Sequence, residues 1–203
     1  KYTVNLPAYQ TYVGIADVLS HLLERYFSDE KNSDTTDYLI EGAVRALLVN
    51  ADRLIEDPAN INARAEIQWL ASVAHNNFLD AGRSADWGSH RIEHELSAQY
   101  NITHGEGMAI VFTAWTKYIA DIKPWRLALL ASRVYGKDPY DYSEKERALL
   151  LSDELEKFFK KLGIKTHLSE LGIDDKDFEV MAQRATKGGN VGHYVPLDSQ
   201  KIV

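Results

Sequence analysis

The sequence contains no cysteine among its 203 residues. A disulfide framework, a thiolate metal site and a cysteine nucleophile are therefore excluded. Any metal ion would have to be bound by histidine and carboxylate side chains. The absence of cysteine is compatible with a reducing cytoplasm, which is the location that we expect.

Long apolar runs, excess positive charge and β-hairpin signals are also missing. No stretch approaches eighteen consecutive apolar residues, so we expect neither a membrane span nor a secretory signal peptide. The formal net charge of −7 disfavours nucleic acid and anionic membranes as partners. Neither Asn-Gly nor Asp-Gly occurs, which removes the strongest short hairpin signal. These absences favour a helical globular domain.

The five prolines leave two long stretches in which helices can run without interruption. Asn60 and Ser143 are predicted N-caps, and Thr35 or Asp34 is the expected N-cap of the helix before Asn60. Further helices are predicted over residues 88–100, 105–121, 124–135, 144–162 and 175–186. We therefore predict an all-α fold, a helical bundle, in one domain that spans residues 1–203.

Three of the seven histidines lie close together, at positions 90, 94 and 104. His90 and His94 are four residues apart, so a helix projects both from one face. His104 follows a polar, β-branched segment that would end this helix. The pattern is typical of part of a metal site, although the charged residues between His90 and His94 also fit a solvent-exposed face.

A second pair of possible ligands lies upstream. Asp17 and His21 are also four residues apart, on a strongly helical segment. Such a pair in isolation is more often a surface interaction than a ligand pair. Here the neighbouring Ile15 and Val18 are apolar, which indicates that Asp17 or His21 is partly buried and needs a partner. A cation shared with the histidine-rich segment across a helical bundle is one such partner.

With these residues identified, the sequence resembles the iron-containing, group III alcohol dehydrogenases, especially their NAD(P)H-dependent butanol dehydrogenase branch. That family binds its metal through an Asp-x-x-x-His pair and the outer histidines of a His-x-x-x-His-(x)9-His-Gly motif. The resemblance covers essentially the whole chain and is most specific over residues 6–27 and 80–110. It implies the all-helical C-terminal domain of an iron-dependent alcohol dehydrogenase and dehydroquinate synthase-like fold.

Carried over residue by residue, the resemblance implies that Asp17, His21, His90 and His104 are the metal ligands. The implied ion is Fe²⁺, with Zn²⁺ as the alternative. The resemblance places His94 beside the metal, near the reacting carbons, as a catalytic residue. Because histidine titrates near neutral pH, His94 suits a relay of the alcohol proton to solvent. The alternative is that His94 only orients its neighbours.

Several other residues have two readings. Trp87 and Trp115 either wall an apolar substrate pocket or belong to the core. Glu24 either hydrogen-bonds a metal ligand or is a surface charge. The glycine-rich segment 188–194 is predicted to be a turn, because no hydrophobic strand precedes it to build a phosphate loop. His75 has no local signal that distinguishes it from an ordinary core or surface residue.

The resemblance also implies a dinucleotide-binding α/β domain, which this sequence does not contain. No alternation of strands and helices and no glycine-rich loop between a strand and a helix is present. Lys1 is not a natural initiator. We expect the chain to be the C-terminal part of a longer enzyme that binds NAD or NADP mainly through its N-terminal domain. The resemblance implies that this enzyme is a homodimer.

The ligand set itself indicates a chemistry. One carboxylate and three neutral imidazoles leave a divalent ion with a charge of about +1, so it can polarise a substrate oxygen. We expect interconversion of a small primary alcohol and its aldehyde by hydride transfer with NAD(P), and an isolated fragment without activity. Two alternatives stay open. One is a metal-dependent hydrolase with Glu93 or Glu95 as general base, and the other is a non-catalytic helical interaction domain.

Overall fold

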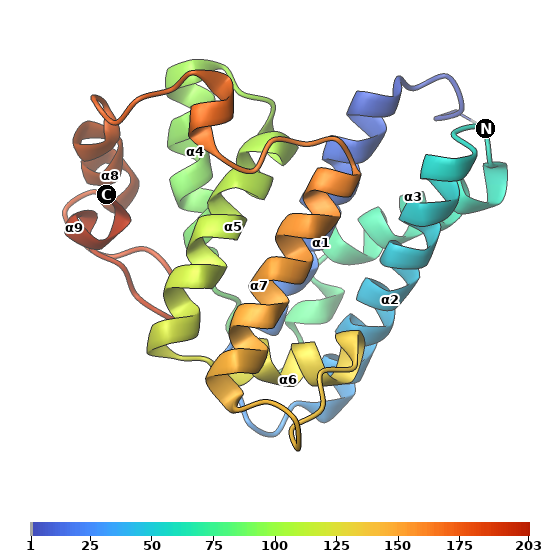
Figure 1. The fold of residues 1–203 in the computed structure, drawn as a ribbon, viewed down its shortest axis with the longest axis horizontal. Coiled ribbons are helices and arrows are strands. Elements are labelled where there is room, and N and C mark those ends of the chain that lie inside the picture. Colours follow the sequence, from blue (N-terminus) through green and yellow to red (C-terminus); the bar gives the residue numbers. More distant parts are fainter. Residues whose placement is uncertain (1) are drawn as a thin grey trace.

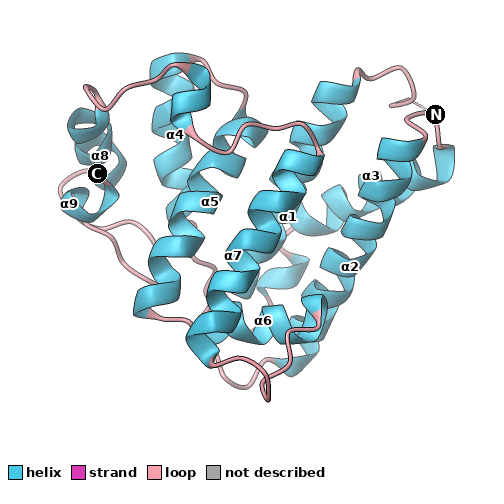
Figure 2. Cartoon of the chain, viewed as in Figure 1, coloured by secondary structure: helices cyan, strands magenta, loops and turns pink. Residues whose placement is uncertain are grey.

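The computed structural model describes residues 2–203, which form nine α-helices and two 3₁₀ helices (Figures 1 and 2). The helices are α1 (Ala8–Tyr26), α2 (Asp34–Glu56), α3 (Ile61–His75), η1 (Phe78–Asp80), α4 (Gly88–Tyr100), α5 (His104–Ile122), α6 (Trp125–Tyr135), α7 (Glu144–Lys161), η2 (Leu168–Leu171), α8 (Phe178–Thr186) and α9 (Ser199–Ile202). Within the described residues the only β pairing is an isolated antiparallel bridge between Val191 and Leu197. The predicted all-α fold is confirmed.

Four of the five predicted helix ranges agree with α4, α5, α6 and α7 to within one residue at each end. The cap of α7 is local, since Ser143 and Glu146 form the reciprocal hydrogen bonds of a capping box. Asn60 caps α3 by accepting a hydrogen bond from the Ala63 amide at 3.0 Å. The prediction of a helix from residue 175 was wrong by three residues, because α8 begins at Phe178.

The predicted N-cap of α2 was also wrong. The helix begins at Asp34, and Ser33 occupies the N-cap position instead of Thr35 or Asp34. The Ser33 hydroxyl makes no cap hydrogen bond, because it accepts one from the Arg83 guanidinium at 2.9 Å. A contact with a residue fifty positions away therefore replaces the local cap.

Helix α1 is largely buried in the bundle. It packs against α2, α3 and α5, and α5 packs in turn against α4 and α7 (Figure 1). Ile15, Leu19, Leu22 and Leu23 of α1 are fully buried. Polar side chains on such a helix must find partners inside the protein, because an unpaired buried polar group costs several kcal/mol.

Helix α5 begins very close to α1, and a glycine makes this approach possible. A Cβ atom at Gly105 would overlap the backbone of Val13 in α1. A Cβ at Gly107 would likewise overlap the side chain of Glu93 in α4. The two glycines therefore let the first turn of α5 sit against both helices, which brings His104 next to α1.

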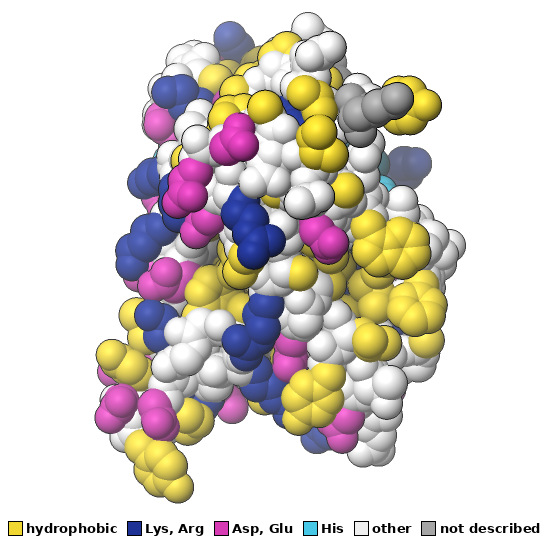
Figure 3. Space-filling view, turned by 90° about the vertical axis from the view of Figure 1, so that its right-hand side faces the viewer, with side chains coloured by type: hydrophobic (Ala, Val, Ile, Leu, Met, Phe, Trp, Pro, Cys, Tyr) yellow, Lys and Arg dark blue, Asp and Glu magenta, His cyan; other side chains and the backbone are white. Residues whose placement is uncertain are grey.

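The outer surface of α2 and α3 mixes apolar and charged side chains. Figure 3 shows hydrophobic side chains distributed among lysine, arginine and acidic residues on this side of the molecule. The exposed apolar residues of these two helices are Tyr38, Leu39, Val49, Ile61 and Trp69. Scattered exposure of this kind is ordinary for a protein surface. None of the helices in residues 2–203 is long and apolar enough to cross a membrane.

Candidate metal centre

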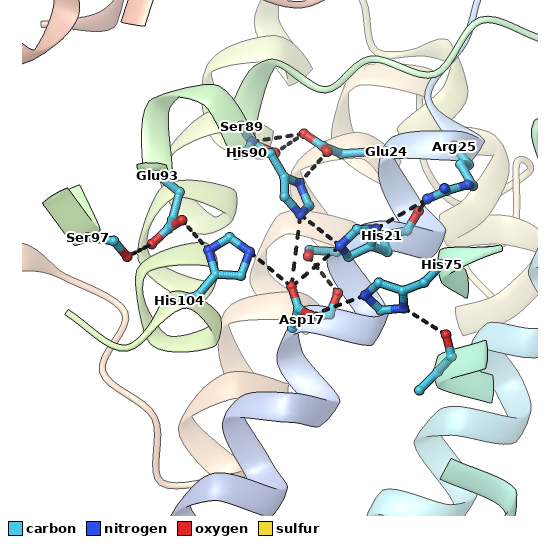
Figure 4. Close-up of polar contacts among 12 residues, drawn as sticks. Asp17, His21, Glu24, Arg25, His75, Ser89, His90, Glu93, Ser97 and His104 are labelled. Atoms are coloured by element: carbon cyan, nitrogen blue, oxygen red, sulfur yellow. Dashed lines mark hydrogen bonds and ion pairs between the residues drawn. The ribbon is translucent and has the colours of Figure 1, made fainter. Parts of the chain in front are cut away.

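The structure brings together the four residues that the sequence predicts as ligands (Figure 4). Asp17 and His21 lie on α1, His90 lies in the first turn of α4, and His104 is the first residue of α5. The His90 Nε2 lies 3.1 Å from the His21 Nε2. The His104 Nε2 lies 3.2 Å from Asp17 Oδ1, which is also 3.7 Å from the His21 Nε2.

These distances suit a divalent cation. Donor atoms bound about 2.1 Å from one zinc ion in a tetrahedron are about 3.4 Å apart. The donors of Asp17, His21 and His90 all lie within 4.8 Å of one another, and His104 joins them through its contact with Asp17. Asp17 Oδ1 is buried and accepts no well-formed hydrogen bond. A cation bound among these donors would compensate its charge.

Glu24 determines which nitrogen of His90 faces the centre. Its Oε2 lies 2.5 Å from the His90 Nδ1, and its Oε1 accepts hydrogen bonds from the Ser89 hydroxyl and the His90 amide. Glu24 is fully buried. Because a carboxylate can only accept, the His90 Nδ1 must donate, which leaves the Nε2 lone pair directed at the centre. Of the two interpretations of Glu24, the structure therefore shows the hydrogen bond, which joins Glu24 to His90, one of the four predicted ligands.

Glu93 plays the same part for His104. Its Oε2 accepts a hydrogen bond from the His104 Nδ1, and its Oε1 accepts one from the Ser97 hydroxyl at 2.5 Å. Glu93 is also fully buried. From the sequence, Glu93 was considered only as a possible general base. A buried glutamate between two histidines of the motif was the signal for this other role, because its side chain points into the bundle.

The pKa values of the predicted ligands are shifted in different directions. Burial and the neighbouring His90 lower the pKa of His21 to about 3, so its imidazole is neutral. The contacts with Asp17 and Glu93 raise the pKa of His104 to about 10. Burial on its own raises the pKa of Asp17, but the surrounding histidines outweigh it and leave the pKa below its ordinary value.

The three histidines, His21, His90 and His104, border a cavity of about 640 Å³. His94 also lines this cavity and is exposed, with its ring centroid 5.6 Å from that of His104. Trp87 lines it too, which supports the pocket reading for this residue. Trp115 instead packs against Phe27 in the core. His94 is thus close to the centre while its ring stays open to solvent.

The glycine-rich segment 188–194 forms part of the cavity wall, and Asp86 holds it there. Asp86 Oδ1 accepts hydrogen bonds from the amides of His193 at 2.9 Å and Tyr194 at 2.7 Å. Asp86 Oδ2 accepts one from the amide of Gly88 at 2.9 Å. Burial raises the pKa of Asp86 to about 6. The segment is a turn, as predicted, but its place at the cavity was missed because only the fold brings it to α4.

His75 was also missed. It is the last residue of α3, and its Nε2 lies 3.4 Å from Asp17 Oδ2. Its ring centroid lies 3.9 Å from that of His21. No spacing in the sequence relates His75 to either residue, since α3 meets α1 only in the folded bundle.

Comparisons with known proteins identify the family of this chain. Residues 11–203 match the Fe-containing alcohol dehydrogenase family, C-terminal. The chain is 32% identical over 207 residues to the NADH-dependent butanol dehydrogenase B of Clostridium acetobutylicum, covering all of this chain and 53% of that protein. It is 31% identical over 201 residues to the probable NADH-dependent butanol dehydrogenase 1 of Bacillus subtilis, covering 99% and 52%. The chain thus spans about half the length of the curated relatives it matches.

Solved structures share the fold. The substrate- and cofactor-free aldehyde reductase YqhD from E. coli superposes with a TM-score of 0.89 at 29% identity, over 99% of this chain and 54% of that one. The NADH-dependent butanol dehydrogenase A from Thermotoga maritima gives a TM-score of 0.89 at 32% identity, over 98% and 52%. The helical bundle and the matched sequence together show that this chain belongs to the Fe-containing alcohol dehydrogenase family.

Proposed function

We propose that this chain supplies the metal-binding part of an NAD(P)-dependent oxidoreductase that interconverts small primary alcohols and their aldehydes. The observation that carries this proposal is the convergence of Asp17, His21, His90 and His104, with the three histidines at the wall of one cavity. Bound there, Fe²⁺ or Zn²⁺ would supply Lewis acidity toward the oxygen of the alcohol or aldehyde. The names of the relatives support the reaction class, since they are NADH-dependent butanol dehydrogenases and an NADPH-dependent aldehyde reductase.

The protein's own contribution is to orient the donors before any ion binds. Glu24 and Glu93 each hold one imidazole through its Nδ1, so that the Nε2 faces the centre. Both carboxylates are fully buried and cannot turn toward solvent without losing these bonds. Carboxylates that support ligand histidines in this way raise their basicity and fix their rings.

His94 is the proposed proton carrier. It lies beside the donors rather than among the four proposed ligands, and it is exposed on the cavity wall. One ring nitrogen can therefore face a substrate hydroxyl while the imidazole stays in contact with water. In that position His94 exchanges the hydroxyl proton with solvent as general base or general acid.

The dinucleotide is proposed to bind mainly to an N-terminal α/β domain outside this chain. Residues 2–203 contain no strand followed by a glycine-rich loop and a helix, which is the usual cradle for its phosphates. The family resemblance supports the further proposals of a homodimer and a cytoplasmic location. It does not distinguish NAD from NADP, because the residues that recognise the ribose belong to the other domain.

The hydrolase alternative loses its general base in this structure. Both oxygens of Glu93 already accept hydrogen bonds, from His104 and from Ser97. Glu95 is paired with the Arg184 guanidinium at 2.8 Å and lines a different cavity on the other side of α4. Among the described residues, neither of the proposed bases is free to activate a water at the centre.

Metal analysis of the purified chain tests the proposal. We expect about one equivalent of Fe²⁺ or Zn²⁺ per chain after loading and removal of excess metal. The variant His90→Ala should lose this metal, because it removes a donor, whereas His94→Gln should retain it. A folded parent chain that binds no metal would contradict the proposal. Equal metal loss in the His94→Gln variant would show that the roles of the motif histidines are assigned in the wrong order.

Activity provides the second test. The 203-residue chain alone should show no saturable NAD(P)-dependent turnover of butanol or butyraldehyde, because hydride transfer needs the nicotinamide held at about 3 to 3.5 Å from the substrate carbon. Turnover should appear in the full-length protein that includes the dinucleotide-binding domain. There, His94→Gln should lower turnover by about 10²- to 10⁴-fold while metal stays bound. Turnover by the isolated chain would reveal a dinucleotide site within residues 1–203.

A further inference from the structure

His75 lies directly behind the proposed metal centre, on the side of Asp17 opposite His104 (Figure 4). Its side chain is 40% exposed, so it is not a core residue. Its ring nevertheless makes two close contacts inward. The ring centroid is 3.9 Å from that of His21, at an interplanar angle of 40°, and the Nε2 is 3.4 Å from Asp17 Oδ2.

The orientation of this ring is determined by its own helix. The His75 Nδ1 lies 2.7 Å from the carbonyl oxygen of Ala71, one turn earlier in α3. The Ala71 carbonyl and the Asp17 carboxylate can both only accept, so these two contacts require a hydrogen on each ring nitrogen of His75, and the Nε2 is directed away from α3. The end of α3 therefore holds the Nε2 toward the second oxygen of Asp17.

The two oxygens of Asp17 thus have different surroundings. Oδ1 faces the proposed ligands His21, His90 and His104 at 3.2 to 3.9 Å. Oδ2 faces His75. A carboxylate with a partner on Oδ2 cannot rotate freely about its terminal bond, so Oδ1 stays aimed at the centre.

We propose that His75 is a positioning residue for the metal centre: it holds Asp17 through Oδ2 and His21 through ring contact, so that both donors are oriented for the ion. This inference rests on the proposed metal site. It adds a supporting side chain on the α1 and α3 side, where neither Asp17 nor His21 has a buried glutamate such as Glu24 or Glu93 behind it.

Two substitutions separate the contributions of the ring and the nitrogen. His75→Phe keeps a planar ring against His21 but removes the Nε2, so Asp17 Oδ2 loses its partner. His75→Gln places an amide nitrogen near the position of the Nε2, where it can donate to Asp17 Oδ2. Because the site is 40% exposed, both variants should fold. His167→Phe, at another exposed histidine, is the matched control for the loss of one imidazole.

The experiment measures Zn²⁺ affinity by competition with a chromophoric chelator and the visible d–d absorption of the Co²⁺-loaded chain. We expect His75→Phe to weaken Zn²⁺ binding about 10- to 100-fold and to shift the Co²⁺ bands, as loss of a residue behind a ligand does. His75→Gln should recover most of the affinity and the parent spectrum. His167→Phe should match the parent in both measurements.

Two results would overturn the inference. Zn²⁺ affinity and Co²⁺ bands of His75→Phe equal to those of the parent would show that Asp17 needs no help from His75. Failure of His75→Gln to recover any affinity, with Co²⁺ bands that indicate one nitrogen ligand fewer, would make His75 a direct ligand instead. His90→Ala keeps this test apart from the proposed function, because failure of the metal site itself would leave the parent and His90→Ala equally unable to bind Zn²⁺.

Discussion

Two buried polar clusters flank the C-terminal half of α1, and they differ in how their charged and polar groups are paired. The first, which we call the Asp37 cluster, consists of Asp37, Arg83 and Arg126. The Arg126 guanidinium binds both oxygens of Asp37 at 2.6 and 2.7 Å, and Arg83 binds Oδ1 at 2.6 Å. Arg126 also donates to the carbonyl of Tyr26, the last residue of α1, at 2.7 Å. Opposite charges meet within this cluster, and Arg126 and Asp37 are almost entirely buried.

The proposed metal centre does not contain such carboxylate–guanidinium pairs. Asp17 Oδ1 lies within 3.9 Å of the Nε2 atoms of His21, His90 and His104, and the histidines face an open cavity. Glu24 and Glu93 support this arrangement, because they accept hydrogen bonds from the Nδ1 atoms of His90 and His104 on the far side of each ring. The difference shows how a structural cluster and a functional one can be told apart. In the Asp37 cluster a carboxylate meets guanidinium groups, whereas the proposed metal centre brings imidazole nitrogens and one carboxylate oxygen together beside a cavity.

The largest expected effect breaks the Asp37 cluster. Asp37→Asn leaves two buried guanidiniums without their carboxylate, which should lower the free energy of unfolding by about 3 to 5 kcal/mol. Urea denaturation measures this change. The control Asp29→Asn removes an exposed ion pair with Lys123 and should change it by no more than about 1 kcal/mol. Metal binding of the folded Asp37→Asn chain should equal that of the parent, and loss of metal at full folding would mean that the two clusters are not separate.

The same cluster predicts an acid dependence. Burial on its own raises the pKa of Asp37, but the guanidiniums of Arg126 and Arg83 outweigh it and hold the pKa below 3.8. A carboxyl with a lowered pKa in the folded state stabilises the protein above its unfolded pKa, and this contribution is lost as pH falls through the folded pKa. The stability difference between the parent and Asp37→Asn should therefore be constant above about pH 5 and should shrink on acidification below about pH 4. A difference that grows on acidification would contradict this sign.

The next effect concerns the approach of α5 to α1. Gly105→Ala places a Cβ against the backbone of Val13, so α5 must move outward and carry His104 away from Asp17. Overpacking of this kind should cost about 1 to 3 kcal/mol of unfolding free energy and should also weaken metal binding. Gly14→Ala on exposed α1 surface is the matched control, because nothing lies within 4 Å of its added Cβ. Gly105→Ala with unchanged metal affinity would show that His104 does not depend on this contact.

The smallest effect removes one supporting charge from the metal centre. Glu93→Gln replaces the buried carboxylate that orients His104, which should weaken Zn²⁺ binding about 10- to 100-fold with little change in helix content. Glu95→Gln, two residues along α4 and paired with Arg184, should bind Zn²⁺ as the parent does. Chelator competition measures both variants. Equal Zn²⁺ affinities of Glu93→Gln and Glu95→Gln would show that the hydrogen bond between Glu93 and His104 does not support metal binding.

Residues near one another in the sequence were predicted most successfully. The capping box of Ser143 and Glu146 and the cap at Asn60 involve partners only three residues apart, so the pattern contains the whole interaction. The cap of α2 was wrong because Ser33 binds Arg83, which no local pattern reveals. The i, i+4 spacing of Asp17 and His21 placed them together on one helix. Their meeting with the α4 and α5 histidines was expected from the family resemblance.

The sequence by itself determined the helices and the types of donor available, because periodicity, caps and the absence of cysteine act over a few residues or over composition alone. Only the tertiary structure decided which side chain contacts each predicted ligand on the side away from the proposed ion. Glu24 behind His90, Glu93 behind His104 and His75 behind Asp17 depend on how α1, α3, α4 and α5 pack. Helices pack through many small contacts between residues that are far apart in the sequence. Which groups form hydrogen bonds at the centre depends on all of these contacts together, so a local pattern does not reveal it.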